Sequence, residues 1–197
     1  MKGLDILTPK GQKTLADEMK CKSLFEATNP GRLYIATPKD MPADVDAVIL
    51  RGASIEAVVE QKSRYNCRLT TFMETWDGEW LITSSKLDRG YRASMALQVP
   101  FYGFLYIVDD DLLLTKKFSG PDGVWVAKIR REETVTQATV NGGSAFRLNA
   151  FVDMTDAKIH RRPEPAKPKA ATIHDSTRDW VTEYEAEEKR QWGAHKQ

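Results

Sequence analysis

The chain has 197 residues, 41% of them hydrophobic and 29% charged, which suffices for one domain with an appendage. Its net charge of +1 excludes a global basic field, so a nucleic-acid partner would require a local basic patch. Two cysteines, Cys21 and Cys67, without a CxxC pattern indicate a reducing, cytoplasmic compartment, and the longest apolar run, residues 99–108, is too short to span a membrane.

The predicted elements begin with a helix and three strands. Thr8 as the N-cap and Pro9 in the first turn predict a helix that runs to about Ala27. Residues two apart in an extended strand share a face, so Glu60 and Lys62 are expected to point the same way. Apolar runs bounded by turn residues predict strands at residues 32–37, 45–50 and 55–62.

The rest of the body continues this alternation of strands and helices. Polar residues 63–75 are consistent with either a helix or a loop. Further elements are expected as a strand at 79–83, a helix at 87–99, a hairpin of 101–108 with 112–118, a strand at 124–130, and β segments at 134–140 and 145–151. The expected fold class is mixed α/β (α+β), with a central mixed sheet flanked by helices, over a domain of residues 1–157.

The C-terminal part has a different composition. Residues 158–174 are rich in proline, lysine and arginine and lack a hydrophobic pattern, which predicts a basic linker. Residues 175–197 are expected to form an amphipathic helix that carries Trp180, Tyr184 and Trp192 on a thin aromatic stripe. This helix would dock on its own domain or bind a protein partner.

The distribution of histidine restricts the chemistry. His160, His174 and His195 all follow the predicted body. Zinc hydrolases and Ser-His or Cys-His catalysis require a histidine, and neither common form of glycine-rich phosphate loop is present. Any chemistry of the body is therefore expected to use carboxylates, lysine and a metal ion.

Two neighbouring strands supply such groups. Asp46 opens the second predicted strand, and Glu60 and Lys62 end the third. Carboxylates gathered at the ends of neighbouring strands form an oxygen-rich site that suits a hard cation such as Mg²⁺. Asp44 remains an alternative to Asp46, because it lies two residues upstream and would share its face in a longer strand.

The first helix offers a further carboxylate. A stripe of Leu15, Met19, Lys22 and Glu26 is flanked by Glu18, which would point into a site beneath the helix. Glu26 is a second candidate of the same kind. The alternative is that Glu18 forms a solvent-exposed pair with Lys22 at i,i+4.

These residues carry a resemblance to a known family. The order is a helix with a glutamate, a strand, a strand opened by Asp46, a strand ending in Glu60-Gln61-Lys62, and then a helix and further strands. Over residues 8–108 this resembles the PD-(D/E)XK, or restriction-endonuclease-like, nuclease superfamily. The sequence departs from the family pattern in having Val45 instead of proline before Asp46.

The resemblance implies a restriction-endonuclease-like core and a metal-dependent DNA nuclease that hydrolyses phosphodiester bonds in recombination, repair or phage and mobile-element DNA processing. Asp46, Glu60 and the backbone carbonyl of Gln61 would hold Mg²⁺, with Mn²⁺ as an alternative ion. Lys62 would orient or deprotonate the attacking water. Glu18 would assist through a water molecule or a second ion.

Substrate contacts are expected from Arg64 and Lys86, because a phosphate contact requires a charged donor, and from Gln98 on the second long helix. A homodimer, or a local basic cleft, would reconcile DNA binding with the near-neutral net charge. The residues of the basic cleft would be Lys62, Arg64, Arg68, Lys86, Arg89 and Arg92.

Two other hypotheses remain. One is a catalytically inactive nuclease fold that binds nucleic acid or assembles with partners. The other is an α/β interaction protein whose C-terminal helix is the functional part.

Overall fold

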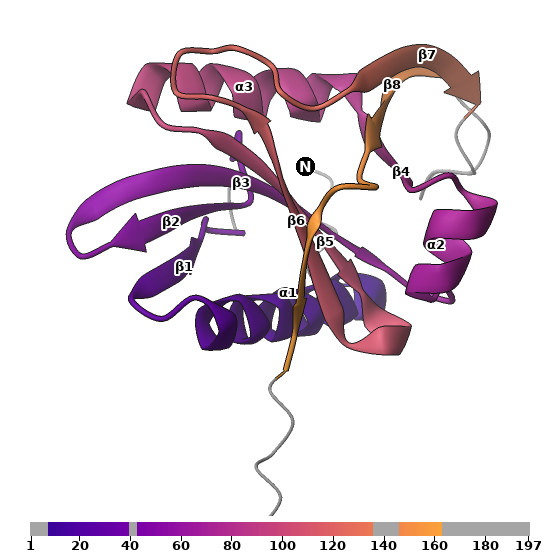
Figure 1. The fold of residues 1–197 in the computed structure, drawn as a ribbon, viewed down its shortest axis with the longest axis horizontal. Helices are drawn as coiled ribbons and strands as arrows, with labels where there is room; N and C mark the ends of the chain where they lie inside the picture. The colour runs from indigo at the N-terminus through magenta and orange to yellow at the C-terminus, as the bar shows by residue number, and fades with distance from the viewer. Residues whose placement is uncertain (1–7, 40–42, 136–145, 163–197) are drawn as a thin grey trace, which may run out of the picture. The chain divides into compact units, whose positions relative to one another are not determined.

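The computed structural model describes residues 8–39, 43–135 and 146–162, which belong to one compact unit ending at Arg162 (Figure 1). The predicted C-terminal helix and the linker beyond Arg162 lie outside the described residues. The unit is mixed α/β, as predicted, and contains a curled mixed sheet flanked by helices. Its elements are α1 (Pro9–Thr28), β1 (Arg32–Ala36), β2 (Ala47–Arg51), β3 (Ser54–Arg64), α2 (Leu69–Thr75), β4 (Glu79–Thr83), α3 (Ser84–Leu97), β5 (Phe101–Ile107), a 3-10 turn (Val108–Asp110), β6 (Leu112–Ser119), β7 (Ile129–Val135), β8 (Phe146–Asp153) and β9 (Lys158–Arg161).

The main sheet has six strands in the order β1-β2-β3-β5-β6-β9. Neighbouring strands are antiparallel except β3 and β5, which are parallel and therefore need a long crossover connection. That connection contains α2, β4 and α3. The crossover brings the first turn of α3 to the end of β3, where the predicted catalytic residues lie.

Alternation along β3 and β5 places apolar side chains on both faces of the sheet. One face packs against α1 through a core that includes Phe25, Val59 and Phe104. The other face packs against α2, β4 and α3 through a core that includes Val58 and Leu105. The sheet is thus covered by helices on both sides (Figure 1).

The start of α1 confirms the predicted N-cap, because the Thr8 side chain accepts a hydrogen bond from the Gly11 N–H at 3.0 Å. The predicted apolar stripe is wrong. Cys21, Leu24 and Phe25 are buried instead, and Met19 is 60% exposed. Few apolar residues mark a face on this helix, so packing against the sheet decides which side is covered.

The second sheet is small and antiparallel, with the order β4-β8-β7. Ala150 and Val152 of β8 and Ile82 of β4 are buried in the core on the α3 side of the main sheet. An ion pair of 2.6 Å between Arg131 of β7 and Asp88 of α3 ties this sheet to the helix. The β7–β8 ribbon is therefore fixed beside the first turns of α3.

Two predictions in the last part of the body need correction. Residues 124–130 alternate as in a strand, but β7 begins only at Ile129, and residue Gly123 before the run has a φ of 79° that bends the chain. The predicted linker does not begin at residue 158, because Lys158–Arg161 form β9 and pair with β6. A short, charged edge strand buries only alternate side chains, here His160, so its composition resembles a linker.

Candidate active site

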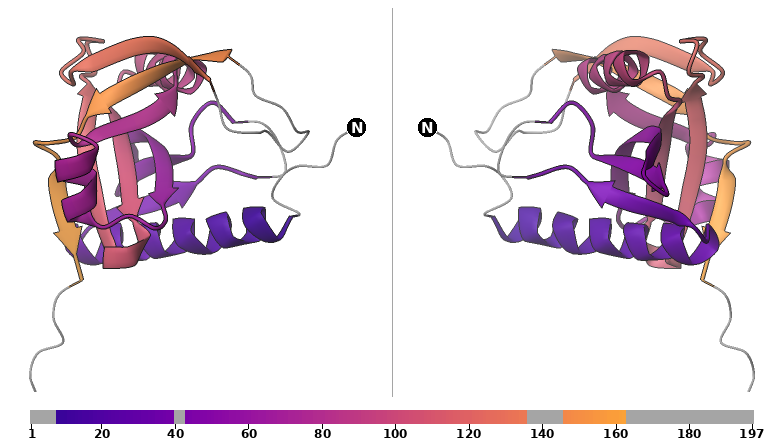
Figure 2. Two further views of the ribbon diagram at one scale, coloured as in Figure 1. Left: turned by 90° about the vertical axis from the view of Figure 1, so that its right-hand side faces the viewer. Right: turned by 90° about the vertical axis from the view of Figure 1, so that its left-hand side faces the viewer.

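A cleft of about 1000 Å³ opens where the C-terminal half of β3 faces the first turns of α3. The N-terminal half of α1 and the ends of β4 and β8 complete its walls. Both views of Figure 2 show the start of α1 and the ends of β7 and β8 projecting toward the same side of the sheet. This cleft contains the acidic and basic groups that the sequence singled out.

The cleft exists because β2 is shorter than β3. Their pairing ends at Ala47 and Val59, and residues 60–64 of β3 continue with β5 as a partner on one side only. Asp46, the residue before β2, fills the vacated position, and its Oδ2 accepts a hydrogen bond from the Gln61 N–H at 2.9 Å. The start of β2 therefore positions the Asp46 carboxylate beside the Glu60-Gln61-Lys62 segment.

Four carboxylates line the cleft: Glu18 from α1, Asp46, Glu60, and Asp88 of α3, which pairs with Arg131. Lys86, in the first turn of α3, lies with its Nζ 2.6 Å from a Glu60 carboxylate oxygen and 3.8 Å from one of Asp46. Lys39 lies 3.2 Å from Glu18 and 3.7 Å from Asp46. Two ammonium groups thus hold together three acids contributed by α1, the start of β2 and the middle of β3.

The crowding of these acids changes their protonation. Burial and the nearby Asp46 charge raise the pKa of Glu60 to about 7, against the opposing effect of Lys86. Burial also raises the pKa of Glu18, although Lys39 partly offsets it. Burial raises the pKa of a carboxyl group by disfavouring its charged form, and a cation bound beside it would favour that form again.

Lys62 shares its face of β3 with Glu60 and lines the same cleft. Its Nζ donates to the Leu81 carbonyl oxygen at 3.4 Å. Burial, with the neighbouring charges of Arg64 and Lys86, lowers the pKa of Lys62 to about 8. A lysine with this pKa exchanges a proton near neutral pH, as a general base or acid must.

The structure distinguishes the alternatives for the acidic groups. Asp44 is exposed and is not part of the cleft wall, whereas Asp46 is. Glu26 accepts the Tyr34 N–H at 2.8 Å and pairs with Lys22 at 2.6 Å. The Glu18–Lys22 pair considered from the sequence is therefore replaced by Glu26–Lys22, and Glu18 lies in the cleft.

The donor set of the cleft consists of oxygen atoms. Within a strand, the N–H and C=O of one residue point to the same edge, so the Gln61 carbonyl faces the edge where Asp46 lies. Carboxylate and carbonyl oxygens are the ligands that Mg²⁺ and Mn²⁺ favour. Among the described residues, no three His, Cys, Asp or Glu side chains are already arranged as a metal-binding group. These oxygen donors fit a hard cation. In the structure, Lys39 and Lys86 neutralise part of the negative charge of the carboxylates.

The predicted substrate-binding residues lie in different places. Lys86 lines the cleft, but the Arg64 guanidinium lies over the Trp76 ring, 5.5 Å from its centre, and is not part of the wall. Gln98 caps the opposite end of α3, about 18 Å from Lys86 along the helix. These two residues are not brought together with the carboxylates.

Two arginines, Arg89 and Arg147, line the cleft wall, whereas the predicted substrate-binding residues Arg64 and Gln98 do not. Neither forms a salt bridge with another described residue. Arg89 was part of the basic cleft expected from the sequence, but Arg147 and Lys39 were not identified. Arg147 is brought near Asp46 only by the tertiary fold, whereas Lys39 lies in the connection between β1 and β2; no local motif marks either residue.

The start of α3 adds backbone donors to the same wall. Its N-cap residue, Thr83, makes no side-chain capping hydrogen bond, and Thr83, Ser84 and Ser85 all line the cleft. The first N–H groups of a helix have no partner within the helix and carry partial positive charge. This end of α3 therefore favours an anionic group in the cleft.

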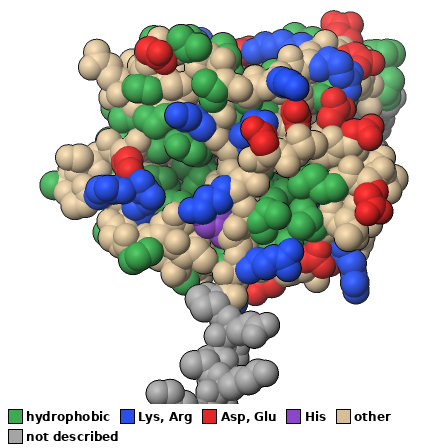
Figure 3. Space-filling view, viewed as in Figure 1, with side chains coloured by type: hydrophobic (Ala, Val, Ile, Leu, Met, Phe, Trp, Pro, Cys, Tyr) green, Lys and Arg blue, Asp and Glu red, His purple; other side chains and the backbone are tan. Residues whose placement is uncertain are grey.

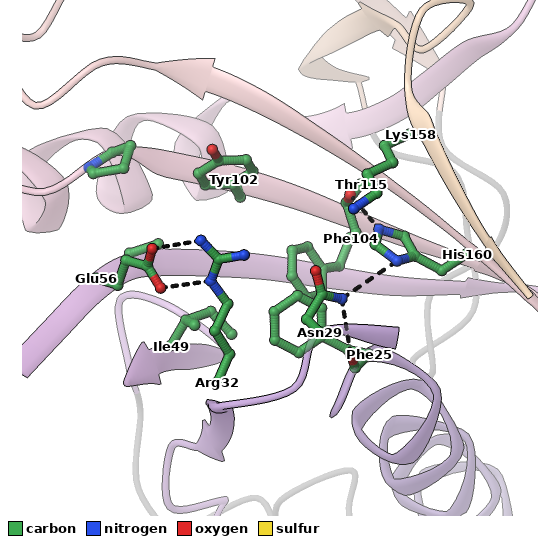
Figure 4. A pocket seen from close by; sticks show the side chains of 12 residues that line it. Phe25, Asn29, Arg32, Ile49, Glu56, Tyr102, Phe104, Thr115, Lys158 and His160 are labelled. Atoms are coloured by element: carbon green, nitrogen blue, oxygen red, sulfur yellow. Dashed lines mark hydrogen bonds and ion pairs between the residues drawn. The ribbon is translucent and has the colours of Figure 1, made fainter. Parts of the chain in front are cut away.

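A second cavity, the His160 pocket, lies on the α1 face of the sheet and has a volume of about 250 Å³. Figure 3 shows a histidine side chain at the floor of a hollow bordered by hydrophobic and basic side chains. Its polar groups pair with one another (Figure 4): Arg32 contacts both Glu56 oxygens at 2.6 Å, and the His160 ring lies 2.9 Å from the Thr115 hydroxyl.

The position of His160 corrects the expectation that the body lacks histidine. The side chain is 3% exposed, and burial lowers its pKa to about 4, which keeps the ring neutral at pH 7. Its second nitrogen lies 2.9 Å from the Thr28 hydroxyl. Both ring nitrogens are therefore engaged in holding β9 to α1 and β6, outside the Asp46 cleft.

Comparisons with family models, with curated proteins and with solved structures find no match to this chain. Within the described residues, none of the helices has the length and apolar character needed to cross a bilayer. The cysteines Cys21 and Cys67 are both buried and free. Inference about function therefore depends on the chemistry of the cleft.

Proposed function

We propose that this protein is a metal-dependent DNA nuclease of the PD-(D/E)XK type, which hydrolyses phosphodiester bonds in the Asp46 cleft. The observation that carries the proposal is that Asp46, Glu60 and Lys62 line one cleft, at the point where β2 begins and β3 continues beyond its pairing with β2. An acid, a second acid and a lysine of lowered pKa are the groups that this hydrolysis requires when histidine is absent from the cleft.

Asp46, Glu60 and the Gln61 carbonyl would hold the ion, for which Mg²⁺ is the first choice and Mn²⁺ the alternative. A divalent cation in this place supplies positive charge to the phosphate oxygens and lowers the pKa of a water molecule. The geometry supports this assignment, because the Lys86 ammonium lies 2.6 Å from Glu60 and 3.8 Å from Asp46, so a cation near this position would contact both carboxylates. Glu18 would orient water at the edge of the site.

The remaining groups act on the substrate directly. Lys62 would accept a proton from the attacking water or stabilise the charge that develops on the phosphate. Lys86, Arg89 and Arg147 would contact phosphate groups on either side of the cleaved bond. The uncapped start of α3 would hold a phosphate oxygen through its backbone N–H groups.

DNA is the proposed substrate because Lys86, Arg89 and Arg147 line the same cleft as the carboxylates, and several cations beside the site suit the phosphates of a polyanion. A cytoplasmic site of action, in recombination, repair or phage and mobile-element DNA processing, is part of the proposal. The proposal also includes that the local basic cleft binds the DNA. A homodimer is the alternative way to reconcile DNA binding with the near-neutral net charge.

The second candidate is a nuclease-like fold that binds nucleic acid without cleaving it. The observation that favours it is the contact of 2.6 Å between Lys86 and Glu60, because this ammonium takes a place next to the carboxylate that a cation would use. A binding module would keep the basic wall and lose the metal dependence.

The test is to incubate the full-length protein with duplex, single-stranded and branched DNA in Mg²⁺ or in chelator. The proposal expects cleavage in Mg²⁺, recovery of activity in Mn²⁺ and none in chelator. Binding that is equal in both conditions, with no cleavage of any of the three DNAs, would instead favour the module. Cleavage that persists in chelator would contradict the metal assignment.

A further inference from the structure

The β7–β8 ribbon presents apolar side chains to solvent beside the cleft. In β8, Phe146 and Leu148 share a face with Ala150 and Val152, because alternate residues of a strand point the same way. Ala150 and Val152 are buried in the core, whereas Phe146 is 78% exposed and Leu148 47%. The core-facing side of the strand thus continues beyond the core as an exposed apolar strip.

The partner strand extends this strip. Val135 of β7 pairs with Phe146 and is 56% exposed, so the two side chains form an apolar cross-strand pair at the end of the described ladder. Exposed aromatic and aliphatic residues grouped in one place mark a binding surface more often than scattered ones do. The strip is formed by residues of regular strands.

The strip is continuous with the proposed active site. Leu148 lines the Asp46 cleft, and so does Arg147, the residue between the two apolar side chains. Arg147 is exposed and has no salt bridge to any other described residue. Arg147 and Leu148 therefore bring a cation and an apolar side chain to the same cleft, a combination that complements a chain that alternates phosphates and flat rings.

The ribbon is held in this position. The Arg131–Asp88 ion pair joins β7 to α3 at 2.6 Å, and a hydrogen bond of 2.7 Å from the Asn149 amide to the Thr134 hydroxyl crosses the ladder. Ala150 and Val152 anchor β8 in the core. The strip therefore keeps a fixed place relative to Lys62 and Lys86.

We propose that this strip binds unpaired bases of the DNA strand whose phosphate occupies the cleft, with Phe146 stacked on a base and Arg147 on the neighbouring phosphate. Bases offer their flat faces to a side chain only when they are unpaired, since those of a duplex stack on one another. The preferred substrate is therefore single-stranded DNA, or DNA with an unpaired segment. The inference rests on the proposed nuclease function for the identity of the polyanion.

Binding in chelator separates this inference from catalysis. Fluorescence anisotropy of the full-length protein would be measured with a labelled single strand and with the same strand annealed to its complement. Phe146→Leu, which keeps an apolar side chain but removes the ring, is expected to weaken single-strand binding by about 5- to 100-fold. Phe146→Tyr should keep the wild-type affinity, and the duplex affinity should change less than about twofold in either variant.

Two controls define the role of the neighbouring groups. Leu97→Ala removes an exposed apolar side chain at the far end of α3 and should leave binding unchanged. Arg147→Gln should weaken single-strand and duplex binding alike and reduce the salt dependence of binding by about one phosphate contact. Because Phe146 is exposed, its variants should melt at the wild-type temperature.

The outcomes discriminate between the two proposals. Equal single-strand affinity of wild type and Phe146→Leu would overturn the stacking role, even if cleavage is observed. Selective loss of single-strand binding would support it, even if no cleavage is found. If the wild type is a dimer and Phe146→Leu a monomer with unchanged DNA affinity, the strip is a contact between copies of the chain, and the proposal fails.

Discussion

The Asp46 cleft and the His160 pocket are both polar cavities against the same sheet, but their charges are balanced differently. In the His160 pocket, Arg32 and Glu56 form a bidentate pair and both ring nitrogens of His160 are engaged. In the cleft, burial and crowding raise the pKa of Glu60 and lower that of Lys62. The pKa of His160 is shifted to about 4, so its ring stays neutral at pH 7 and serves the fold, whereas Glu60 and Lys62 have pKa values of about 7 and 8 and can exchange protons in a reaction.

The largest effect that we predict from this comparison is the loss of cleavage when Asp46 is replaced. Asp46→Asn should lower Mg²⁺-dependent DNA cleavage by about 10²- to 10³-fold, because it removes a ligand charge where several kcal/mol of stabilisation are needed. Single-turnover cleavage of a labelled strand measures it. Asp44→Asn is the matched control, since Asp44 is exposed two residues away. Equal losses in both variants would show that the position of Asp46 in the cleft is irrelevant.

The next prediction concerns stability in the His160 pocket. Because the folded pKa of His160 is lowered from 6.5 to about 4, the unfolded chain binds more protons between these values. The wild type should lose up to about 3 kcal/mol of unfolding free energy through this group as the pH falls from 6.5 to 4. Urea denaturation across this range should show the deficit of His160→Gln shrinking toward low pH. A deficit independent of pH would contradict the burial of a neutral ring.

The Asp46 cleft should show the opposite dependence. The folded pKa of Glu60 is raised from 4.5 to about 7, so its contribution is present below pH 4.5 and is lost as the pH rises to 7. In chelator, Glu60→Gln should therefore gain stability relative to wild type between pH 4.5 and 7, by at most about 3 kcal/mol. The same urea experiment measures it. A gain toward acidic pH would contradict the raised pKa of the buried Glu60 carboxyl group.

The smallest effect distinguishes the two helix acids. Glu18→Gln should lower the cleavage rate by about tenfold, as expected for a group that orients ligands of the site from outside. Glu26→Gln should leave the rate unchanged, because Glu26 pairs with Lys22 and with the Tyr34 N–H instead. Cleavage rates at saturating Mg²⁺ measure both. A larger loss in Glu26→Gln than in Glu18→Gln would be inconsistent with the position of Glu18 in the cleft.

How far the sequence predicts this molecule depends on how local each feature is. The strands that carry Asp46, Glu60 and Lys62 follow one another along the chain, so apolar runs and turn residues were enough to place them. Arg147 reaches the cleft only through the tertiary fold, and the sequence around it resembles that of any surface residue. Lys39 lies near Asp46 in the chain, but nothing in the sequence of the β1–β2 connection marks it as a partner of Glu18 and Asp46. Arg64 and Gln98 were assigned by proximity in sequence and by helix membership, neither of which fixes where a side chain ends.

The same distinction explains the errors in the fold. The alternation in residues 124–130 predicted a half-buried strand, but Val124 and Val126 are exposed and β7 begins only at Ile129, because alternation does not require a hydrogen-bonded partner. β9 was missed because a charged four-residue edge strand is defined by its pairing with β6 and by one buried side chain, His160. Because its side chain is buried, His160 belongs to the body of the protein and not to the predicted linker.

The most direct test of the central claim is the cleavage of labelled single-stranded DNA in Mg²⁺ by wild type, Lys62→Ala and Lys117→Ala. Lys117 is an exposed strand lysine outside the cleft and serves as the matched control. We predict that Lys62→Ala lowers the rate by about 10²- to 10⁴-fold, with an unchanged melting temperature, while Lys117→Ala keeps the wild-type rate. Undiminished Mg²⁺-dependent cleavage by Lys62→Ala would contradict the assignment of this cleft as the active site.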